Sequence, residues 1–543
     1  MININITTNR FWKEYKDYNL TIWIKGNIYS HSIRSIIEIC KKIKKDELQS
    51  FISSIYGHFA LVVKKEDLTF IAVDKIRSTS LFFTKIKNDF YIDCDPKNLV
   101  NLNEFSKTID NKAKLELAMS GFTIGNKTIY ENLFSLKAGE LVFFHENKYE
   151  YVHYYKYFGK VVNKTFDEYF QDLTKVTLNI FQKILDEIGD RQIIVPLSGG
   201  HDSRLIASIL KHLGAKNVKC YTYGTPNNFE AKIAQKIANK LGYEWKFIPL
   251  THNSEKKYYS SDEYKKYLEF SETFSSVPFI QSLSSIRYLK DMDWISHDAI
   301  FINGLSGDFI SGGHAKIESK DNYNSPTLQI RKQNILNQLI KKHFSLWGYL
   351  KSKKNTNIIK ETLWCEITKA CGNLEDENQD HLFYEYSELI DRQSNYVIKK
   401  QKIYEFYGYN WKLPFWDDHF LFFWQKVPLQ YKLNQKLYIE MLKKKNYGNV
   451  WGDDFLLNKK TITPKWIIPL RFICKIPFSI FGKVGKNAWK QFDINFFKYF
   501  TSIPHTWDMF NYIRIIKDIS KRPRNSVSWQ SEDYLKIFKE SKN

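Results

Sequence analysis

Cysteine is scarce in this sequence, and its few residues lie far apart. The 543 residues include six cysteines, at positions 40, 94, 220, 365, 371 and 474. None of them forms a Cys-x-x-Cys pair, which argues against a zinc site or a redox-active dithiol. We expect buried, reduced thiols and no framework of disulfides.

Long apolar runs are also missing. A membrane-crossing helix needs about 18 uninterrupted apolar residues, and no stretch of the sequence is that long. The polar and aromatic start, MININITTNRFW, lacks the pattern of a signal peptide. We therefore expect a soluble, cytoplasmic protein, and its length predicts two or three domains with ample core.

Acidic residues are outnumbered by basic ones. Lysine and arginine total 81 against 59 acids, a net charge of +22, which raises nucleic acid or an anionic membrane as a partner. The lysines are spread, however, as in KKIKK at 41–45 and KKK at 443–445. They accompany abundant Ile, Asn, Tyr and Phe, a mixture that AT-rich codons produce across a whole proteome. We favour solvated faces and expect no specific nucleic acid.

The most informative segment is IIVPLSGGHDS at 193–203. Gly199 and Gly200 let the backbone turn and bring its N–H groups against an anion, while Ser198 and Ser203 add hydroxyl donors. Asp202 adds a carboxylate that can hold a metal ion. The segment predicts a binding loop for pyrophosphate.

The residues around this loop fit that interpretation. The apolar residues at 193–197 predict a buried strand, and Leu205 to Leu213 repeat at helical spacing before Gly214. A second strand at 218–224, a helix closed by Gly242 and a strand at 244–250 follow. Alternating strands and helices predict a doubly wound α/β sheet.

No Gly-Lys-Ser/Thr follows the loop, so it is not the phosphate loop of kinases and GTPases. Ser-Gly-Gly-x-Asp-Ser resembles the signature of the ATP pyrophosphatase (PP-loop) enzymes, which cleave ATP between its α and β phosphates and pass AMP to an oxygen. Relatives of asparagine synthetase, of argininosuccinate or GMP synthetase, and tRNA-modifying enzymes all remain open at this point.

Further segments resemble the asparagine synthetases. AIFINGLSGDFISGGH at 299–314 is similar to their second nucleotide loop, with Gly304, Asp308 and the glycines at 312 and 313 coinciding. By that resemblance Asp308 is the second magnesium carboxylate beside Asp202, and Gly224 and Gly304 line the nucleotide pocket. Tyr223 is assigned to the adenine. Mg²⁺ commonly takes one or two carboxylates together with phosphate oxygens.

A third synthetase-like segment lies at 407–442, with Pro-Phe-x-Asp, an aromatic-rich helix and a later lysine. By correspondence Lys436 is the active-site lysine, which would neutralise charge on the adenylate and the departing phosphate. A solvated lysine is the alternative.

The N-terminal part resembles the glutaminase half of the same family. IWIKGNIYSHS at 22–32, YGHFALVV at 56–63, FIAVDKIRSTSLFF at 70–83 and TIYENLFSLKAGELVFF at 128–144 follow its order and spacing. The resemblance therefore covers roughly residues 20 to 445.

The chain departs from the family at the glutaminase site. Residue 2 is Ile where the family has a nucleophilic Cys, and the opening strands have no counterpart. Lys25-Gly26-Asn27 replaces the Asn-Gly-Glu that holds glutamine, and Cys40 and Cys94 stand at positions that the family does not use. We expect a degenerate glutaminase fold, without glutaminase activity, that serves as a structural partner.

A second departure concerns the step in which ammonia attacks the activated carboxylate. The family has Glu three residues before Asp308, whereas this chain has Leu305, which cannot move protons. Asp417, Asp418 and Glu405 are candidate substitutes that spacing does not separate.

Arg392, Gln393 and Ser394, together with the 304–314 loop, resemble asparagine-synthetase-like proteins of bacterial surface polysaccharide clusters. This likeness implies a uronic acid or amino-sugar carboxylate as substrate.

The tail from about 450 lies outside the resemblance. WIIPLRFICKIPFSIFGKV at 466–484 is apolar, aromatic and cationic, and such a stretch can lie in a membrane interface. Pro469 and Pro477 interrupt it, and we favour packing against the synthetase domain, with peripheral membrane contact as the alternative.

The predicted organisation is a truncated, N-terminal-nucleophile-like α+β glutaminase-type domain at 1–155, a PP-loop α/β domain at 165–450 and a helical extension at 451–543. The expected reaction is ATP- and Mg²⁺-dependent adenylation of a carboxylate, followed by attack of free ammonia or another amine. The rivals are a tRNA-modifying PP-loop enzyme and a nucleotide-binding protein or scaffold without activity.

Overall fold

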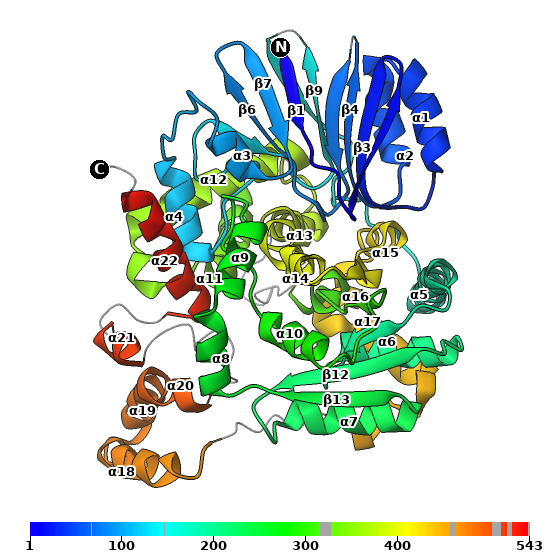
Figure 1. The fold of residues 1–543 in the computed structure, drawn as a ribbon. Helices are drawn as coiled ribbons and strands as arrows, with labels where there is room; N and C mark the ends of the chain where they lie inside the picture. Colours follow the sequence, from blue (N-terminus) through cyan, green and yellow to red (C-terminus); the bar gives the residue numbers. More distant parts are fainter. Residues whose placement is uncertain are drawn as a thin grey trace.

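The computed structural model describes residues 1–66, 68–145, 147–314, 327–456, 463–501, 512–518 and 524–540. Parts of the predicted C-terminal extension, at 457–462, 502–511, 519–523 and 541–543, therefore lie outside the described residues. Figure 1 shows two β-sheets in the N-terminal third and a third sheet in the body below them.

The N-terminal third is a sandwich of two sheets. One sheet is antiparallel, in the order β10-β9-β5-β4-β3-β2, and the other has the order β1-β7-β6-β8. Apolar side chains such as Val62, Ile71 and Phe83 fill the space between the sheets, and a second apolar cluster lies under α1 and α2. The strands are β1 (Ile2–Asn5), β2 (Trp12–Asp17), β3 (Leu20–Ile28), β4 (Gly57–Lys65), β5 (Thr69–Val73), β6 (Phe82–Ile86), β7 (Asp89–Asp93), β8 (Leu133–Ser135), β9 (Glu140–His145) and β10 (Lys148–His153). The helices of this part are α1 (Ile33–Lys42), α2 (Leu48–Ser54), α3 (Pro96–Val100) and α4 (Asn111–Ser120).

The third sheet is parallel throughout, in the order β13-β12-β11-β14-β15. Its strands are β11 (Ile193–Pro196), β12 (Val218–Gly224), β13 (Glu244–Pro249), β14 (Ile300–Ile302) and β15 (Asn410–Lys412). The predicted strands and the parallel α/β sheet are confirmed. Strand order reverses direction around β11, and a ligand site is expected at the carboxyl ends of strands on either side of such a point.

Helices surround this sheet and connect its strands. They are α5 (Phe166–Ile188), α6 (His201–His212), α7 (Phe229–Leu241), α8 (His252–Tyr259), α9 (Asp262–Ser271), α10 (Leu283–Asp291), α11 (Leu328–His343), α12 (Lys353–Cys371), α13 (Asp380–Ser387), α14 (Gln401–Phe406), α15 (Asp418–Trp424), α16 (Leu429–Lys432) and α17 (Lys436–Lys445). Helix α5 begins at a capping box made by Thr165 and Glu168 and bridges the end of the N-terminal third to β11.

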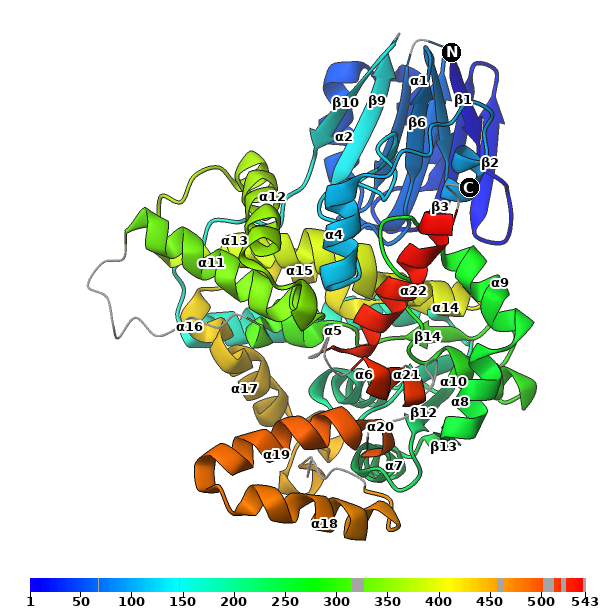
Figure 2. The same cartoon turned by 90° about the vertical axis from the view of Figure 1, so that its left-hand side faces the viewer.

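The C-terminal tail is helical, as predicted. It contains α18 (Ile467–Ser479), α19 (Gly482–Phe496), α20 (Lys498–Thr501), α21 (Tyr512–Lys517) and α22 (Ser526–Glu540). Helix α22 returns to the body and lies beside α4, as Figure 2 shows. Its side chains also reach the segment after α9, where Tyr534 donates to Glu272 at 2.6 Å and Gln530 to the Pro278 carbonyl at 2.7 Å.

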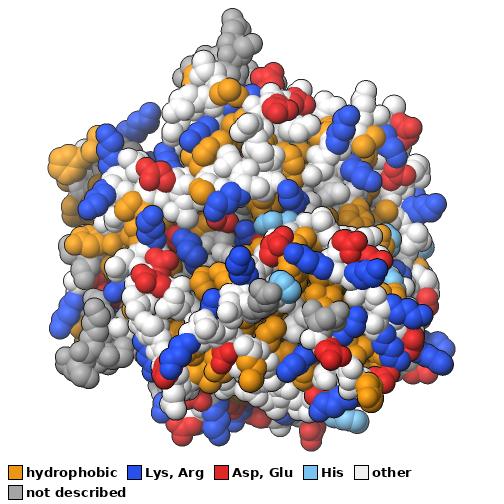
Figure 3. Space-filling view, turned by 90° about the horizontal axis from the view of Figure 1, so that it is seen from above, with side chains coloured by type: hydrophobic (Ala, Val, Ile, Leu, Met, Phe, Trp, Pro, Cys, Tyr) orange, Lys and Arg blue, Asp and Glu red, His pale blue; other side chains and the backbone are white. Residues whose placement is uncertain are grey.

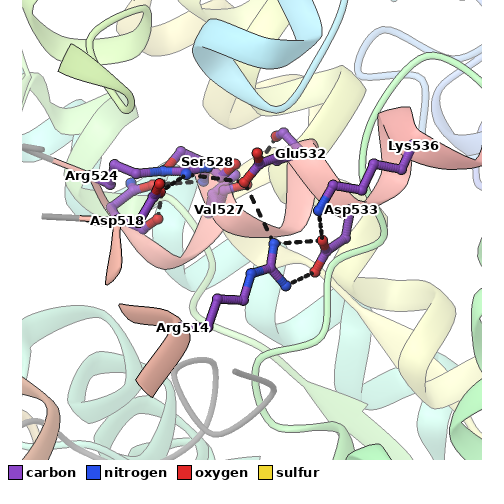
Figure 4. A network of polar contacts seen from close by, with 10 residues as sticks. Arg514, Asp518, Arg524, Val527, Ser528, Glu532, Asp533 and Lys536 are labelled. Atoms are coloured by element: carbon purple, nitrogen blue, oxygen red, sulfur yellow. Dashed lines mark hydrogen bonds and ion pairs between the residues drawn. The ribbon is translucent and has the colours of Figure 1, made fainter. Parts of the chain in front are cut away.

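Two arginines form ion pairs with acidic residues of the tail, on and beside α22 (Figure 4). Arg524 pairs with Asp518 and, at 3.0 Å, with Glu532, and its guanidinium lies 3.8 Å from the ring centre of Trp347. Arg514 pairs with Asp533 at 2.6 Å.

Much of the segment 466–484 is exposed to solvent, contrary to the packing that we expected from the sequence. Phe472 is 68 % exposed and Ile473 is 62 % exposed, because α18 packs on α19 and leaves its other side uncovered. The expectation of packing against the synthetase domain is wrong for these side chains. In the part of the chain that the structure describes, no helix is long and apolar enough to cross a membrane.

The surface charge is mixed where it can be seen. On the face in Figure 3, Lys and Arg alternate with Asp and Glu and do not gather into one basic patch. This distribution agrees with the spread of lysines along the sequence.

Candidate active site

The loop after β11 is shaped by its serines and by the start of α6. Gly200 is the residue that precedes the helix, and no side chain caps it. The Ser198 hydroxyl accepts from the Gly200 N–H at 3.2 Å and lies 3.0 Å from the Ser203 hydroxyl. The uncapped first turn of the helix can therefore face an anion, as the motif predicts.

Arg204 holds the loop from behind. It donates to the Gly199 carbonyl at 2.7 Å and to the Phe455 carbonyl at 2.9 Å, and its guanidinium stands over Trp451. The carbonyl oxygen of Gly199 is thereby bound to a guanidinium. Burial lowers the pKa of Arg204 to about 10, which leaves it charged at neutral pH.

A cavity of about 320 Å³ opens at the carboxyl ends of β11, β12 and β14. Its size is at the lower end of the range for small-molecule sites. It is lined by residues 196–198, 200–203, 221–223, 230, 281, 303–306 and 400. The structure thus brings together Ser198, Gly200, Asp202, Ser203, Tyr223 and Gly304 of the predicted set.

The two predicted loops touch directly. A Cβ on Gly304 would stand 2.9 Å from the Ser203 nitrogen, and one on Gly307 would stand 2.5 Å from the Asp202 carboxyl carbon. The Asp308 N–H donates to the Asp202 carboxylate at 3.1 Å. Only glycines permit this approach.

Asp202 and Asp308 form a pair of acids at this junction. Burial, and then the charge of Asp308, raise the pKa of Asp202 to about 7. Two neighbouring carboxylates with this electrostatic conflict fit a hard divalent cation such as Mg²⁺. Among the described residues, no group of three or more His, Cys, Asp or Glu could hold a metal ion. The remaining ligands would have to be phosphate oxygens and water.

Two histidines and a glutamate support Asp308 from the side. His314 bonds to Asp308 at 3.1 Å and to Glu388 at 2.6 Å, and His343 lies 3.1 Å from Glu388. Burial alone would raise the pKa of Glu388, but the two histidines hold it well below its usual value. Sequence reasoning missed this group because its members come from three distant segments.

The lysine predicted from the third motif lies elsewhere. Lys436 is exposed at the start of α17, with its amine 5.5 Å from the ring centre of Phe166, and it does not line the cavity. This placement gives no support to its expected role. Two residues further along the same helix, the buried Tyr438 donates to Asp202 at 3.1 Å.

Lys400 is the lysine that does line the cavity. It is only 9 % exposed, and burial lowers its pKa to about 8. It makes no ion pair with any residue that the structure describes. The sequence offered only weak signal, because a lysine pair at 399 and 400 resembles the many solvated pairs of this chain.

Tyr223 and Gly224 end β12 beside the cavity. Gln281 donates to the Tyr223 hydroxyl at 3.4 Å, and the tyrosine forms part of the wall. Gly224 is not part of the lining; its carbonyl accepts from the Leu250 N–H at 2.9 Å.

Leu305 lines the cavity, and none of its three candidate substitutes does. Asp418 accepts from the Gly57 N–H at 2.7 Å, and Glu405 pairs with Lys25 at 2.7 Å. Asp417 caps α15. Asp418 and Glu405 thus both bind the N-terminal third, and this placement gives no support to either as the substitute.

Comparison with known proteins agrees with the fold and the loops. Residues 187–448 match the family model described as asparagine synthase, and residues 16–156 match the glutamine amidotransferase domain. No curated protein matches the sequence.

Two solved structures illustrate how distant the structural likenesses are. Glutamine phosphoribosylpyrophosphate amidotransferase from B. subtilis, complexed with ADP and GMP, is 8% identical at a TM-score of 0.20, over 54% of this chain and 64% of that one. The allosteric regulatory enzyme of purine biosynthesis is 9% identical at a TM-score of 0.18, over 53% of this chain and 55% of that one. The chain spans less than two thirds of each.

The two family matches follow one another in the order that the sequence motifs predict, and the second contains both loops that meet at Asp202. The chain is an asparagine synthetase-like protein, in which a segment that matches the glutamine amidotransferase domain precedes one that matches asparagine synthase.

Proposed function

We propose that this protein is an ATP- and Mg²⁺-dependent ligase that activates a carboxylate as its adenylate and converts it to an amide. The observation that carries the proposal is the contact of the two loops at the cavity, where Asp202 meets the backbone of Asp308. An uncapped helix start, Asp202 and the buried Lys400 converge there, and the Asp308 backbone N–H donates to Asp202.

The residues of the cavity suit the first half-reaction. A carboxylate oxygen of the substrate attacks the α-phosphorus of ATP, the bond to the β-phosphate oxygen breaks, and pyrophosphate leaves. The helix start at Gly200 and the hydroxyls of Ser198 and Ser203 bind phosphate oxygens. Lys400 neutralises negative charge on the leaving pyrophosphate. Asp202 and Asp308 would hold Mg²⁺, which screens the phosphate charges when bound.

Tyr438 and His314 act through the acids. Tyr438 donates to one oxygen of Asp202, and His314 bonds to Asp308 while Glu388 fixes the other side of its ring. Both are positioning residues, because they orient carboxylates that would otherwise turn.

In the second half-reaction an amine attacks the acyl adenylate, the bond to AMP breaks and the nitrogen loses a proton. We propose free ammonia or a small amine as the donor. Leu305 places an apolar side chain in the cavity wall at the position where the family resemblance implies a glutamate, which suits a donor that arrives as a neutral amine.

We infer that the N-terminal domain packs against the synthase domain and does not hydrolyse glutamine. Lys25, in the triplet that replaces the glutamine-binding motif of the family, pairs with Glu405 of the synthase domain. Burial raises the pKa of Cys40 and of Cys94 to about 12, so neither is a thiolate at neutral pH.

The substrate class proposed is a sugar carboxylate, a uronic acid or an amino-sugar acid of surface polysaccharide synthesis. Its support is the resemblance of the 304–314 loop and of residues 392–394 to proteins of such gene clusters. Amino acids are the class to compare with it.

The test is pyrophosphate release from ATP, Mg²⁺ and ammonia, with a panel of sugar acids and amino acids. We expect AMP and pyrophosphate in equal amounts with at least one acid, and a loss of at least about a hundredfold in Asp202→Asn. Asp262→Asn, at an exposed ion pair on α9, is the control and keeps full activity.

Two results would contradict the proposal. ATP binding without turnover across the panel identifies a nucleotide-binding protein without this activity. Glutamate release from glutamine by the full chain refutes the structural role of the N-terminal domain.

A further inference from the structure

Helices α18 and α19 form a hairpin, Trp466–Phe496, at the end of the molecule opposite the N-terminal sheets (Figures 1 and 2). Of the 21 strongly exposed large apolar side chains among the described residues, ten belong to this hairpin. They are Trp466, Ile468, Leu470, Phe472, Ile473, Ile476, Ile480, Phe481, Val484 and Ile494. Such a concentration is unusual for a surface in contact with water alone.

The two helices of the hairpin pack against each other through aromatic side chains. Phe478 of α18 packs on Trp489 and Phe492 of α19, with ring centres 5.7 and 5.3 Å apart. A Cβ on Gly485 would stand 1.9 Å from the Phe478 carbonyl oxygen, so this glycine sets a close crossing of the helices. The two helices are therefore fastened to each other, and the apolar side chains outside this contact are left exposed.

The hairpin is strongly cationic, because its basic residues outnumber its acidic ones. Its one acid among the described residues, Asp493, is held by Arg471 at 2.8 Å. Five exposed lysines alternate along the sequence with these apolar residues, at positions 465, 475, 483, 486 and 490. Exposed apolar residues interspersed with lysines that pair with no acid among the described residues match the chemistry of an anionic bilayer surface.

The geometry favours a helix pair that lies in the membrane surface. Helix α18 spans only 13 residues and contains Pro477, and a crossing needs about 20 residues. A second copy of the chain is the less favourable occupant, because two such hairpins would bring like charges together.

We propose that the α18–α19 hairpin docks the protein on an anionic lipid bilayer, with its exposed aromatic and aliphatic side chains inserted at the level of the headgroups. This contact is independent of the proposed ligase reaction.

The test uses the full chain and sedimentation with vesicles of phosphatidylcholine, with or without about 30 mol% phosphatidylglycerol. We expect binding to the anionic vesicles that weakens at least about tenfold in 0.5 M salt and in Phe472→Ser/Ile473→Ser. Both side chains are exposed, so the fold should tolerate the change. Leu328→Ser/Ile537→Ser removes two equally exposed apolar side chains elsewhere and should bind like the wild type.

The oligomeric state, measured by light scattering, separates the alternative. A wild-type dimer that the hairpin substitutions dissociate, without vesicle binding, assigns the surface to a second copy and overturns the proposal. Equal binding of the wild type and the hairpin variant to anionic vesicles overturns it as well, because the contact then lies elsewhere. The proposal is also overturned if the wild type does not bind these vesicles.

Discussion

Lys400 enters the cavity as a buried cation without a paired acid among the described residues. Desolvation without a counter-charge explains why its pKa falls to about 8. Phosphate groups of ATP would supply the missing negative charge. The amine carries its proton below about pH 8 and loses it above that pH.

We expect Lys400→Met to lower kcat/KM for ATP by about a hundredfold, because one preorganised charge at the phosphates is lost. In the wild type, kcat/KM should fall as the pH rises from 7 to 9, since this parameter reports the free enzyme. The variant should lack this decline. Pyrophosphate release over that pH range measures both effects.

Lys436→Met is the matched control, because Lys436 is exposed and lies outside the cavity. It should leave kcat/KM unchanged. A large loss in Lys436→Met with a normal Lys400→Met would restore the role that the sequence motif predicts for Lys436.

At the scale of single elements, α22 shows how a tail outside the matched family regions is tied to the body. The Arg524 side chain is fully buried, and its guanidinium lies 3.8 and 4.0 Å from the ring centres of Trp347 and Trp529. The helix also contacts α4 and the segment around Glu272. One helix therefore joins the N-terminal and synthase parts.

Arg524→Met should make α22 open more readily, by about 2–4 kcal/mol, because a buried ion-pair and cation–π site loses its charge. Hydrogen exchange followed by mass spectrometry should show faster exchange in α22 and no change in β11. The exposed Lys536→Met is the control. Unchanged exchange in α22 would contradict the role of Arg524.

At the scale of the whole molecule, buried polar contacts join the two domains. Lys75 of the N-terminal domain pairs with Asp418 of the synthase domain at 2.7 Å, and both side chains are at most 5 % exposed. Lys399 donates to the Arg77 carbonyl at 2.7 Å, also out of contact with water. These contacts make the N-terminal domain a fixed part of the body.

Lys75→Met should destabilise the protein by about 3–5 kcal/mol, because Asp418 is left as an unpaired buried charge. Urea unfolding followed by tryptophan fluorescence measures the loss, and adding Asp418→Asn should recover part of it. Lys41→Met, at an exposed pair with Asp17, should change stability by about 1 kcal/mol or less. An effect of similar size in both single variants would show that the domain contact contributes little.

Prediction from the sequence succeeded where the signal is local. The strand at 193–196, the glycine turn and the helix from His201 lie next to each other, so propensity and spacing determine them. The tail shows the limit of this reasoning. Its apolar composition fits either a packed or an exposed helix, and only the docking of α18 on α19 decides between them.

The sequence by itself determined the α/β fold, the family and the two loops that meet at Asp202, because each loop carries its function in consecutive residues. The tertiary structure decided which lysine lines the cavity, which side chain supports Asp202 and what Asp418 and Glu405 bind. Lys400, Tyr438 and Glu405 come from separate segments, and their positions follow from the packing of whole helices against the sheet. Spacing along the chain contains no record of such long-range contacts.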